Sequence, residues 1–233
     1  MKIIINGLGR IGKLVFRRLC DENLHKNILM VNEKAGSASD QEYFLRYDTV
    51  HGTWGDDLCF ENGCLNYKDH SIAVMTEGSI ESISFPKSEK FLVVDCTGVN
   101  KSEKLLEPYF ERKASYVLIS APIESSNVQN IVYGINHQSI DTSAYKIFTA
   151  ASCTTNCLAP IVKVLEENIG IKHGSITTIH NITNSQTIVD APKNNLRRSR
   201  SGINSLIPTT TGSARAISCL LYTSDAADDL FRV

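Results

Sequence analysis

Residues 2–12 of the chain read KIIINGLGRIG, an apolar run followed by three closely spaced glycines. The β-branched run at its start predicts a buried strand over Lys2–Asn6. Arg10–Cys20, the next segment, carries apolar side chains at helical spacing and predicts a helix. Glycines in the pattern G-x-G-x-x-G join the two segments. We therefore expect the chain to pass from strand to helix through a tight glycine turn.

This turn is typical of dinucleotide-binding proteins. Gly7 allows the tight turn, Gly9 lets a pyrophosphate approach the backbone, and Gly12 lets helix and strand pack closely. The start of the helix offers unpaired N–H groups to the phosphates. Glu33, about 20 residues further on, can accept both ribose hydroxyls and would repel the 2′-phosphate of NADP. The alternative is that the glycines serve only a turn and Glu33 is a solvated loop charge.

The first 150 residues alternate between strand-like and helix-like segments, which indicates an α/β domain. Its expected sheet is mostly parallel and doubly wound, of the Rossmann type, with helices on both faces. We predict this NAD-binding domain over residues 1–150. Beyond the elements named above, the expected segments are strands at Ile28–Asn32, Leu92–Thr97 and Tyr116–Ser120 and a helix within Lys101–Lys113.

A second, α+β domain is expected over residues 151–218. Cys153–Ile169 has the apolar spacing of a helix, and Ser175–Thr183 is rich in β-branched residues and predicts a strand. Residues 184–205 are polar and basic and long for a connection. Loops of this length in compact domains are usually functional or disordered.

Composition and charge restrict the partners and the compartment. The formal net charge of −1 gives no reason to expect nucleic acid or a membrane surface as a partner. No apolar run approaches the roughly 20 residues that span a bilayer, and no secretory signal is recognised. The seven cysteines are irregularly spaced and form no C-x-x-C pair. A reduced cytoplasmic protein without a metal site fits best.

Cys153 is the candidate nucleophile. It opens a predicted helix, and the helix dipole lowers the pKa of a thiol at that position. Cys157, one turn further on, is interpreted as a packing residue rather than a second redox thiol. His180 ends an apolar run and is the candidate base, because a thiol nucleophile needs one nearby.

A basic loop lies after the histidine. It carries Arg197, Arg198 and Arg200, and the hydroxyl-rich stretch Thr209–Gly212 lies close behind. The loop could be a solvated face or a nucleic acid patch. An anion site for phosphate is the better interpretation, because guanidinium and hydroxyl donors occur together.

Several segments closely resemble the glyceraldehyde-3-phosphate dehydrogenase family, collinearly from residue 1 to about residue 218. The stretch ASCTTNCLAP at residues 151–160 is highly specific by itself. The other matching segments are NGLGRIG at 6–12, YDTVHG at 47–52, TTIH at 177–180 and IPTTTG at 207–212.

The resemblance implies a reaction and assigns residues to it. Cys153 would attack the aldehyde to give a hemithioacetal, His180 would act as base during transfer of hydride to NAD, and inorganic phosphate would cleave the thioester. Residues implied to line the two phosphate sites are Ser152, Thr154, Thr183, Arg198, Thr211 and Gly212. Residues implied to contact NAD are Arg10, Ile11, Glu33 and Ser120, with Thr97 and Gly98 flanking the adenine.

The resemblance also implies an oligomeric state and a particular branch of the family. The segment from Asn181 to about Ser205 resembles the S-shaped loop at the subunit interface of a homotetramer. Most relatives have Asn-Asp where this chain has Asn32-Glu33. The surrounding sequence looks most like the branch of the family that is encoded beside arsenical efflux permeases. In that branch arsenate replaces phosphate, and the product 1-arseno-3-phosphoglycerate is exported. Erythrose-4-phosphate dehydrogenase also carries Asn-Glu, but Thr211–Ala214 agrees more closely with the triose enzyme.

The end of the chain departs from the family. Family members run further, and CLLYTSDAAD at residues 219–228 resembles a translated sequencing adapter. We therefore expect residues 219–233 to be a non-native tail on a truncated catalytic domain. This leaves an NAD-binding module without catalysis as an alternative function. RNA binding through Arg197–Arg200 is a further alternative, which the nearly neutral charge disfavours.

Overall fold

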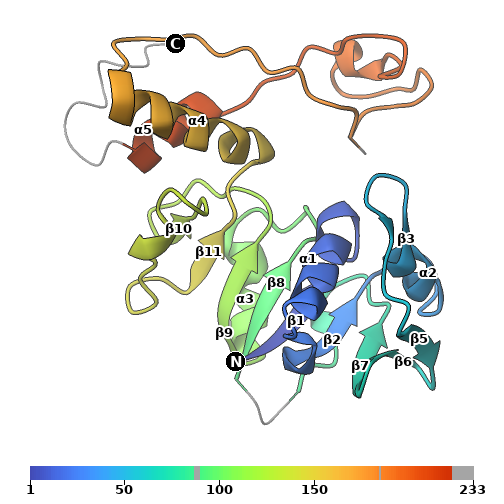
Figure 1. Ribbon diagram of the computed structural model, residues 1–233. Coiled ribbons are helices and arrows are strands. Elements are labelled where there is room, and N and C mark those ends of the chain that lie inside the picture. The colour runs from blue at the N-terminus through green and yellow to red at the C-terminus, as the bar shows by residue number, and fades with distance from the viewer. Residues whose placement is uncertain (87–89, 184, 222–233) are drawn as a thin grey trace. The chain divides into compact units, whose positions relative to one another are not determined.

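The computed structural model describes residues 1–86, 90–183 and 185–221, and the chain divides into two compact units (Figure 1). The first unit covers Met1–Ser152 and the second begins at Cys153. None of the helices formed by the described residues is long and apolar enough to cross a membrane. Most of the expected tail, residues 222–233, lies outside the described residues.

The first unit is built on one sheet, which has nine strands among the described residues in the order β10-β11-β9-β8-β1-β2-β7-β6-β5. Pairing is parallel from β10 to β7 and antiparallel from β7 to β5, so the predicted mostly parallel α/β sheet is confirmed. The strands are β1 (Lys2–Asn6), β2 (Ile28–Asn32), β5 (Leu58–Glu61), β6 (Cys64–Tyr67), β7 (His70–Met75), β8 (Phe91–Asp95), β9 (Ala114–Ile119), β10 (Val128–Asn130) and β11 (Ile147–Thr149), with a separate pair β3 (Tyr47–Asp48) and β4 (Gly52–Thr53).

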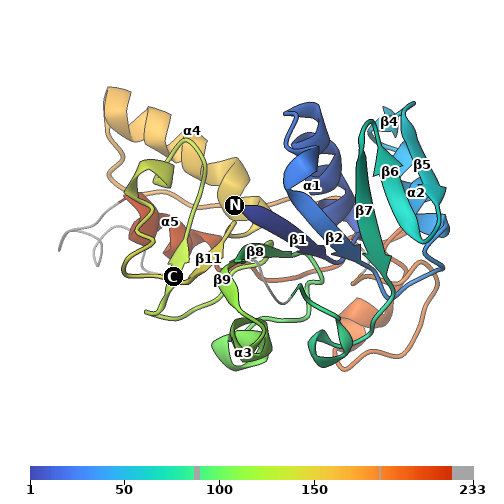
Figure 2. The same cartoon turned by 90° about the horizontal axis from the view of Figure 1, so that it is seen from below.

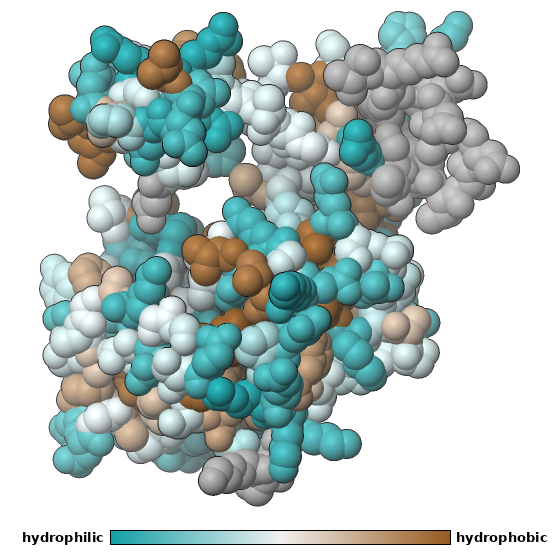
Figure 3. Space-filling view, turned by 180° about the vertical axis from the view of Figure 1, so that it is seen from behind, coloured by the Kyte–Doolittle hydropathy of each residue, from teal (hydrophilic) through white to brown (hydrophobic). Residues whose placement is uncertain are grey.

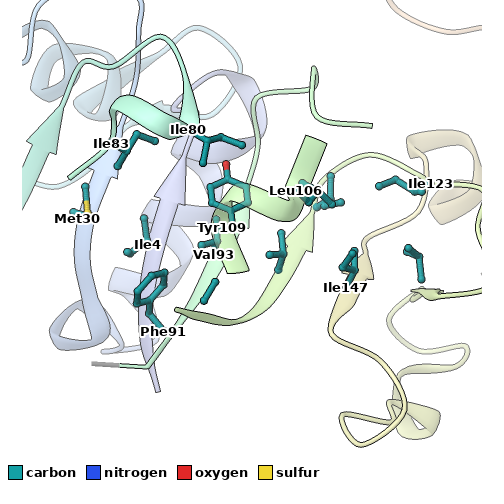
Figure 4. Close-up of a cluster of buried hydrophobic side chains, with 14 residues drawn as sticks. Ile4, Met30, Ile80, Ile83, Phe91, Val93, Leu106, Tyr109, Ile123 and Ile147 are labelled. Atoms are coloured by element: carbon teal, nitrogen blue, oxygen red, sulfur yellow. The ribbon is translucent and has the colours of Figure 1, made fainter. Parts of the chain in front are cut away.

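Helices lie on both faces of this sheet, as Figure 2 shows for α1 and α3. The α-helices of the first unit are α1 (Arg10–Asp21), α2 (Asp40–Arg46) and α3 (Glu103–Glu111). Neighbouring residues of the central strand point to opposite faces, as the period of two in a strand requires. Ile4 packs in the cluster that contains Leu106 and Tyr109 of α3 (Figure 4), whereas Ile5 packs in the cluster that contains Phe16 of α1. The sheet is therefore doubly wound.

The turn from β1 to α1 requires glycine at two of its positions. Gly7 has φ +92°, a left-handed conformation that side chains with a Cβ rarely adopt. A Cβ on Gly12 would lie 1.8 Å from the carbonyl oxygen of Gly7, so only glycine lets the helix approach the turn this closely. A Cβ on Gly9 would meet nothing within 4 Å, which leaves that part of the backbone open to a ligand.

The second unit contains two α-helices among its described residues, α4 (Cys153–Ile169) and α5 (Ser213–Leu221), which contact each other. The segment between them is irregular apart from a short 3₁₀ turn, Leu196–Ser199, and one isolated bridge between Thr187 and Ser201. Both helices begin next to hydroxyl side chains, since Thr155 Oγ1 donates to Ser213 Oγ at 3.1 Å.

The strand predicted at Ser175–Thr183 is wrong, because these residues form no strand in the described structure. β-Branched residues favour an extended backbone, but a strand needs a neighbour that pairs its N–H and C=O groups. The described residues supply no such neighbour here. The side chains accordingly remain in solvent, and Ile179 is 90% exposed.

The other predicted elements form with small differences in their bounds. β1, β2 and α4 begin and end where the sequence predicts. The strand expected at Leu92–Thr97 is Phe91–Asp95, and the one expected at Tyr116–Ser120 is Ala114–Ile119. Both strands end one or two residues earlier than predicted, because Cys96, Thr97 and Ser120 belong to the loops that follow them.

Candidate cofactor and catalytic sites

A cavity of about 250 Å³ lies at the carboxyl ends of β1, β2 and β8 in the first unit. This is the edge at which open α/β sheets bind their ligands. Of the residues that the sequence assigned to a cofactor, Gly7, Gly9, Glu33 and Thr97 line the cavity. Its remaining lining residues are Asn6, Asn32, Lys34, Glu77, Gly78, Ser79, Ile80, Cys96, Val99 and Asn100.

Glu33 is held at this cavity by backbone donors. Its Oε2 accepts a hydrogen bond from the N–H of Leu8 at 2.7 Å, and its Oε1 accepts one from Ala35 at 3.0 Å. The carboxylate is thereby tied to the glycine turn that begins α1. An open backbone at Gly9 and a fixed carboxylate in one cavity are the features that a dinucleotide needs, so the residues present fit NAD.

Arg10 does not line this cavity. Its guanidinium donates to Asp48, a carboxylate that Lys13 also approaches at 3.5 Å. The backbone N–H of His51 is the main cause that holds the pKa of Asp48 well below its usual range, and burial opposes that shift. Arg10 is thus placed by an ion pair with Asp48 rather than by the cavity that contains Glu33.

The remaining predicted cofactor residues, Gly12 of the glycine turn among them, do not line the cavity. Ile11 is half exposed on the first turn of α1. Gly98 has φ +70° in the loop after β8. Ser120 comes directly after β9, and its backbone N–H donates to the carbonyl of Asp95 at 2.9 Å. These three residues border the same edge of the sheet from neighbouring segments.

Asn6, Asn32 and Asp95 were not predicted as site residues, yet they end the three strands at the cavity. All three side chains are almost completely buried. Buried polar groups need partners, and these three belong to one hydrogen-bonded network. The signal was present in the sequence, because each of these predicted apolar strands contains or ends in Asn or Asp.

In the second unit, Cys153 and His180 lie together. The Sγ of Cys153 is 3.3 Å from Nε2 of His180, and Nδ1 of His180 is 2.7 Å from the carbonyl oxygen of Asn181. Because that carbonyl can only accept, Nδ1 carries a hydrogen and Nε2 faces the sulfur. Cys153 is the first residue of α4, where the backbone N–H groups lack partners within the helix.

This contact changes the proton affinity of both groups. Burial alone would raise the pKa of the Cys153 thiol, but hydrogen bonding and charge from His180 and hydrogen bonds from Thr154 lower it overall. The carbonyl of Asn181 and then the sulfur of Cys153 raise the pKa of His180. The two shifts favour a thiolate beside an imidazolium, which is the form of cysteine that reacts as a nucleophile.

The expected anion residues form two separate pairs. Arg198 Nη2 donates to Thr209 Oγ1 at 2.6 Å, and Thr211 Oγ1 is 2.8 Å from Ser213 Oγ. Thr183 Oγ1 is bonded instead to Ser185. Thr154 contacts Cys153 as described above, Ser152 is the last residue of the first unit, and the carbonyl of Gly212 accepts from Ala216 in the first turn of α5.

The cysteines differ sharply in environment. The six that the structure describes are all free thiols. Burial raises the pKa values of Cys20 and Cys96 to about 12. Cys157 is exposed rather than packed in a core, so the packing interpretation of this residue is wrong for the described structure.

Comparison with known proteins gives the class and then the family. Residues 1–103 match the NAD-binding domain of glyceraldehyde 3-phosphate dehydrogenase, and residues 152–225 match its C-terminal domain. Together the two matches cover most of the chain, which therefore consists of an NAD-binding domain followed by a segment that matches the C-terminal domain of the same family. The chain belongs to the glyceraldehyde-3-phosphate dehydrogenase family.

Curated proteins that are similar to this chain are glyceraldehyde-3-phosphate dehydrogenases as well. The chain is 41% identical to glyceraldehyde-3-phosphate dehydrogenase 3 of Nostoc sp. over 95% of its own length and 65% of the relative. It is 38% identical to the enzyme of Mycoplasma pneumoniae, over 93% of the chain and 64% of the relative. It is 38% identical to the enzyme of Geobacillus stearothermophilus, over 95% of the chain and 65% of the relative. The chain thus spans slightly less than two thirds of the length of these relatives.

The Cys153–His180 contact predicts a pH-dependent alkylation rate. Because the pKa of Cys153 is lowered, its reaction with iodoacetamide should rise with pH at lower values than that of an ordinary thiol. His180→Asn should move this rise to higher pH and slow labelling at pH 7 several-fold. Mass spectrometry of labelled peptides measures the rates, with Cys20 and Cys96 as slow internal references. Equal rates at pH 7 for all three cysteines would contradict an activated thiolate.

Proposed function

We propose that this chain takes part in the NAD-dependent phosphorylating oxidation of D-glyceraldehyde 3-phosphate through a thioester on Cys153. The observation that supports the proposal most directly is the 3.3 Å separation of the Cys153 sulfur and His180 Nε2 at the start of α4. An oriented imidazole beside a thiol at a helix N-terminus is the arrangement that covalent catalysis by cysteine requires. Membership of the family supports a phosphorylated aldehyde as the proposed substrate class.

The residues of the pair have distinct roles. The Cys153 thiolate forms a bond to the aldehyde carbon, and the carbonyl oxygen takes the Nε2 proton of the His180 imidazolium to become the hydroxyl of a hemithioacetal, which leaves the imidazole neutral. Nε2 of His180 takes the hydroxyl proton when the carbon is oxidised to the thioester, because Nδ1 is already engaged by Asn181. NAD, held by residues such as Gly9 and Glu33 of the cofactor cavity, would supply the two-electron oxidant for this step as the acceptor of hydride. An oxygen of inorganic phosphate then attacks the thioester, and the Cys153 thiolate leaves.

Donors for the phosphate groups are available close to the pair in sequence. The guanidinium group of Arg198 offers several N–H donors in a planar fork. One of them donates to the hydroxyl of Thr209. We propose Arg198 and Thr209–Gly212 for one phosphate and Ser152, Thr154 and Thr183 for the other. Arsenate has the shape and charge of phosphate, so the same donors would accept it in this role.

Assembly into a homotetramer and a reducing, cytoplasmic location complete the proposal. Residues 185–206 carry exposed apolar side chains among polar ones (Figure 3, upper left), which fits burial against a second subunit. The exposed apolar residues of this stretch are Ile188, Val189, Leu196, Ile203 and Leu206. Free thiols at all six described cysteines fit a reducing compartment.

The position of Glu33 predicts a preference for NAD over NADP. A carboxylate fixed by Leu8 and Ala35 would lie near the 2′-phosphate of NADP and repel it. Glu33→Gln keeps the shape and removes the charge, so the ratio of the two Kd values should fall about tenfold, a shift of the order that one like-charge contact causes. Titration calorimetry with both cofactors measures the two Kd values. The control variant is Glu61→Gln, which removes a carboxylate from an exposed strand end. Equal affinities in the unmutated chain would remove the proposed preference.

The nucleophile assignment predicts the loss of aldehyde oxidation. The assay uses the chain joined at residue 218 to the corresponding C-terminal part of the Nostoc relative and measures NADH absorbance. Cys153→Ser should lower kcat on the order of a thousandfold or more, because a serine hydroxyl is not ionised at neutral pH. Cys157→Ser, one turn along the same helix, should retain activity. Erythrose 4-phosphate should be a poorer substrate, and a reversed preference would overturn the triose assignment.

The arsenate proposal predicts a genetic phenotype. Acyl arsenates hydrolyse in water unless a transporter removes them, so arsenate turnover alone does not separate this chain from its relatives. A gene that encodes the chain joined at residue 218 to the C-terminal part of the Nostoc relative should raise the arsenate tolerance of a sensitive host. The rise should require co-expression of an arsenical efflux permease. The host with the permease and the Cys153→Ser gene is the control. If tolerance never rises, phosphate is the sole co-substrate.

A further inference from the structure

A buried hydrogen-bonded chain runs beneath the cofactor cavity of the first unit. Its first part joins β2 to the loop after β7. Asn32 Nδ2 donates to the carbonyl oxygen of Glu77 at 3.0 Å, and the N–H of Glu77 donates to Asn32 Oδ1 at 2.8 Å. This pair of hydrogen bonds between a side-chain amide and the backbone fixes the wall of the cavity that contains Glu77, Gly78 and Ser79.

The second part fixes the opposite wall, in the loop after β8. Asp95 is 1% exposed, and its Oδ1 accepts from the N–H and the hydroxyl of Thr97 at 2.9 and 2.6 Å. Its Oδ2 accepts from Asn100 Nδ2 at 2.7 Å. Thr97 and Asn100 both line the cavity. The carboxylate thus holds this loop in one conformation through neutral donors.

The hydroxyl of Tyr109 connects the two parts. It accepts from Asn6 Nδ2 at 2.5 Å and donates to Asp95 Oδ2 at 2.8 Å, while Asn6 Oδ1 accepts from Asn32 at 2.8 Å. The direction is fixed, because Asp95 as a carboxylate can only accept and the oxygen of Asn6 is already used by a donor. Only a group that both donates and accepts can stand between them.

Tyr109 reaches this position from α3, outside the predicted cofactor motif. Its ring is completely buried in the cluster of Figure 4, edge-on to Phe85 with ring centroids 6.0 Å apart. Burial and the charge of Asp95 raise the pKa of the phenol, so it stays protonated and keeps donating at all physiological pH values. The packing of the ring therefore sets where the hydroxyl sits, independently of the hydrogen bonds.

We propose that Tyr109 is a positioning residue for the cofactor, whose hydroxyl couples the two walls of the cavity and so prearranges the site for the adenosine diphosphate part of NAD. The proposal rests on the proposed cofactor binding. Hydrogen bonds in series polarise one another, so the chain that ends on the Asp95 carboxylate is stiffer than its separate links. Without the hydroxyl, the Nδ2 group of Asn6 lacks its acceptor. The loops after β7 and β8, which form the two walls, can then move independently.

Tyr109→Phe tests this, because it keeps the ring and removes only the hydroxyl. We expect the Kd for NAD to rise about tenfold, the order of effect expected when buried partners lose a hydrogen bond. ADP-ribose should lose affinity by the same factor, because the effect lies in the half of the ligand without nicotinamide. The alkylation rate of Cys153 should not change. The matched control is Tyr67→Phe, which removes a hydroxyl from another buried tyrosine of the same unit.

Hydrogen exchange without ligand gives a second readout. The N–H groups of Glu77 and Thr97 donate to Asn32 and Asp95, so both should exchange faster in Tyr109→Phe than in Tyr67→Phe. If Tyr109→Phe does not fold, Asn100→Ala opens the chain at its half-buried end and should raise the Kd by a smaller factor. Unchanged Kd values and unchanged exchange overturn the proposal while leaving cofactor binding intact. Failure of the unmutated chain to bind NAD overturns the cofactor assignment, and exchange at Glu77 and Thr97 then decides whether Tyr109 couples the walls.

Discussion

The close approach of α1 to the end of β1 is the constraint on which the first unit depends. The helix can begin where it does only because Gly12 has no side chain to meet the carbonyl of Gly7. This approach accompanies the placement of Gly9, which precedes the first turn of α1, at the cavity and of Leu8 within reach of Glu33. A helix displaced by the width of one methyl group would lose that hydrogen bond and the packing of Phe16 beneath the sheet.

The two units place their functional groups by different physical means. In the first, Asn6, Asn32 and Asp95 are buried and held by several hydrogen bonds each, so the polar groups have little freedom. In the second, Cys153 is fixed by the start of a helix, but His180 stands on an irregular, exposed segment. The orientation of the imidazole there depends on its own contacts with Asn181 and the sulfur.

Local patterns of residues predict the parts of the fold that have a local cause. β1 and β2 are short apolar runs, α4 has the apolar spacing of a helix, and the glycine turn has a steric cause that residue spacing alone reveals. The strand predicted at Ser175–Thr183 is wrong, because local propensity does not supply a pairing neighbour. Tyr109 could not be predicted, because its hydroxyl meets an amide 103 residues away in sequence, and no short-range pattern encodes such a contact. Distant polar pairs become visible only when packing has placed their elements.

Exposure limits what the Cys153–His180 pair achieves by itself. The attraction between a thiolate and an imidazolium is weak in water and several times stronger where solvent is excluded. Both residues are exposed in the described structure, so solvent screens the contact that lowers the pKa of the thiol. Excluding water strengthens the attraction, but it also removes the solvation of both charges, and burial by itself raises the pKa of the thiol. Covering the pair therefore favours the thiolate only where hydrogen-bond donors such as Thr154 compensate for the lost water. The pKa of Cys153 therefore depends on the donors and charges next to the sulfur, whereas the polar network at the cofactor cavity is fixed by burial and by hydrogen bonds among its own members.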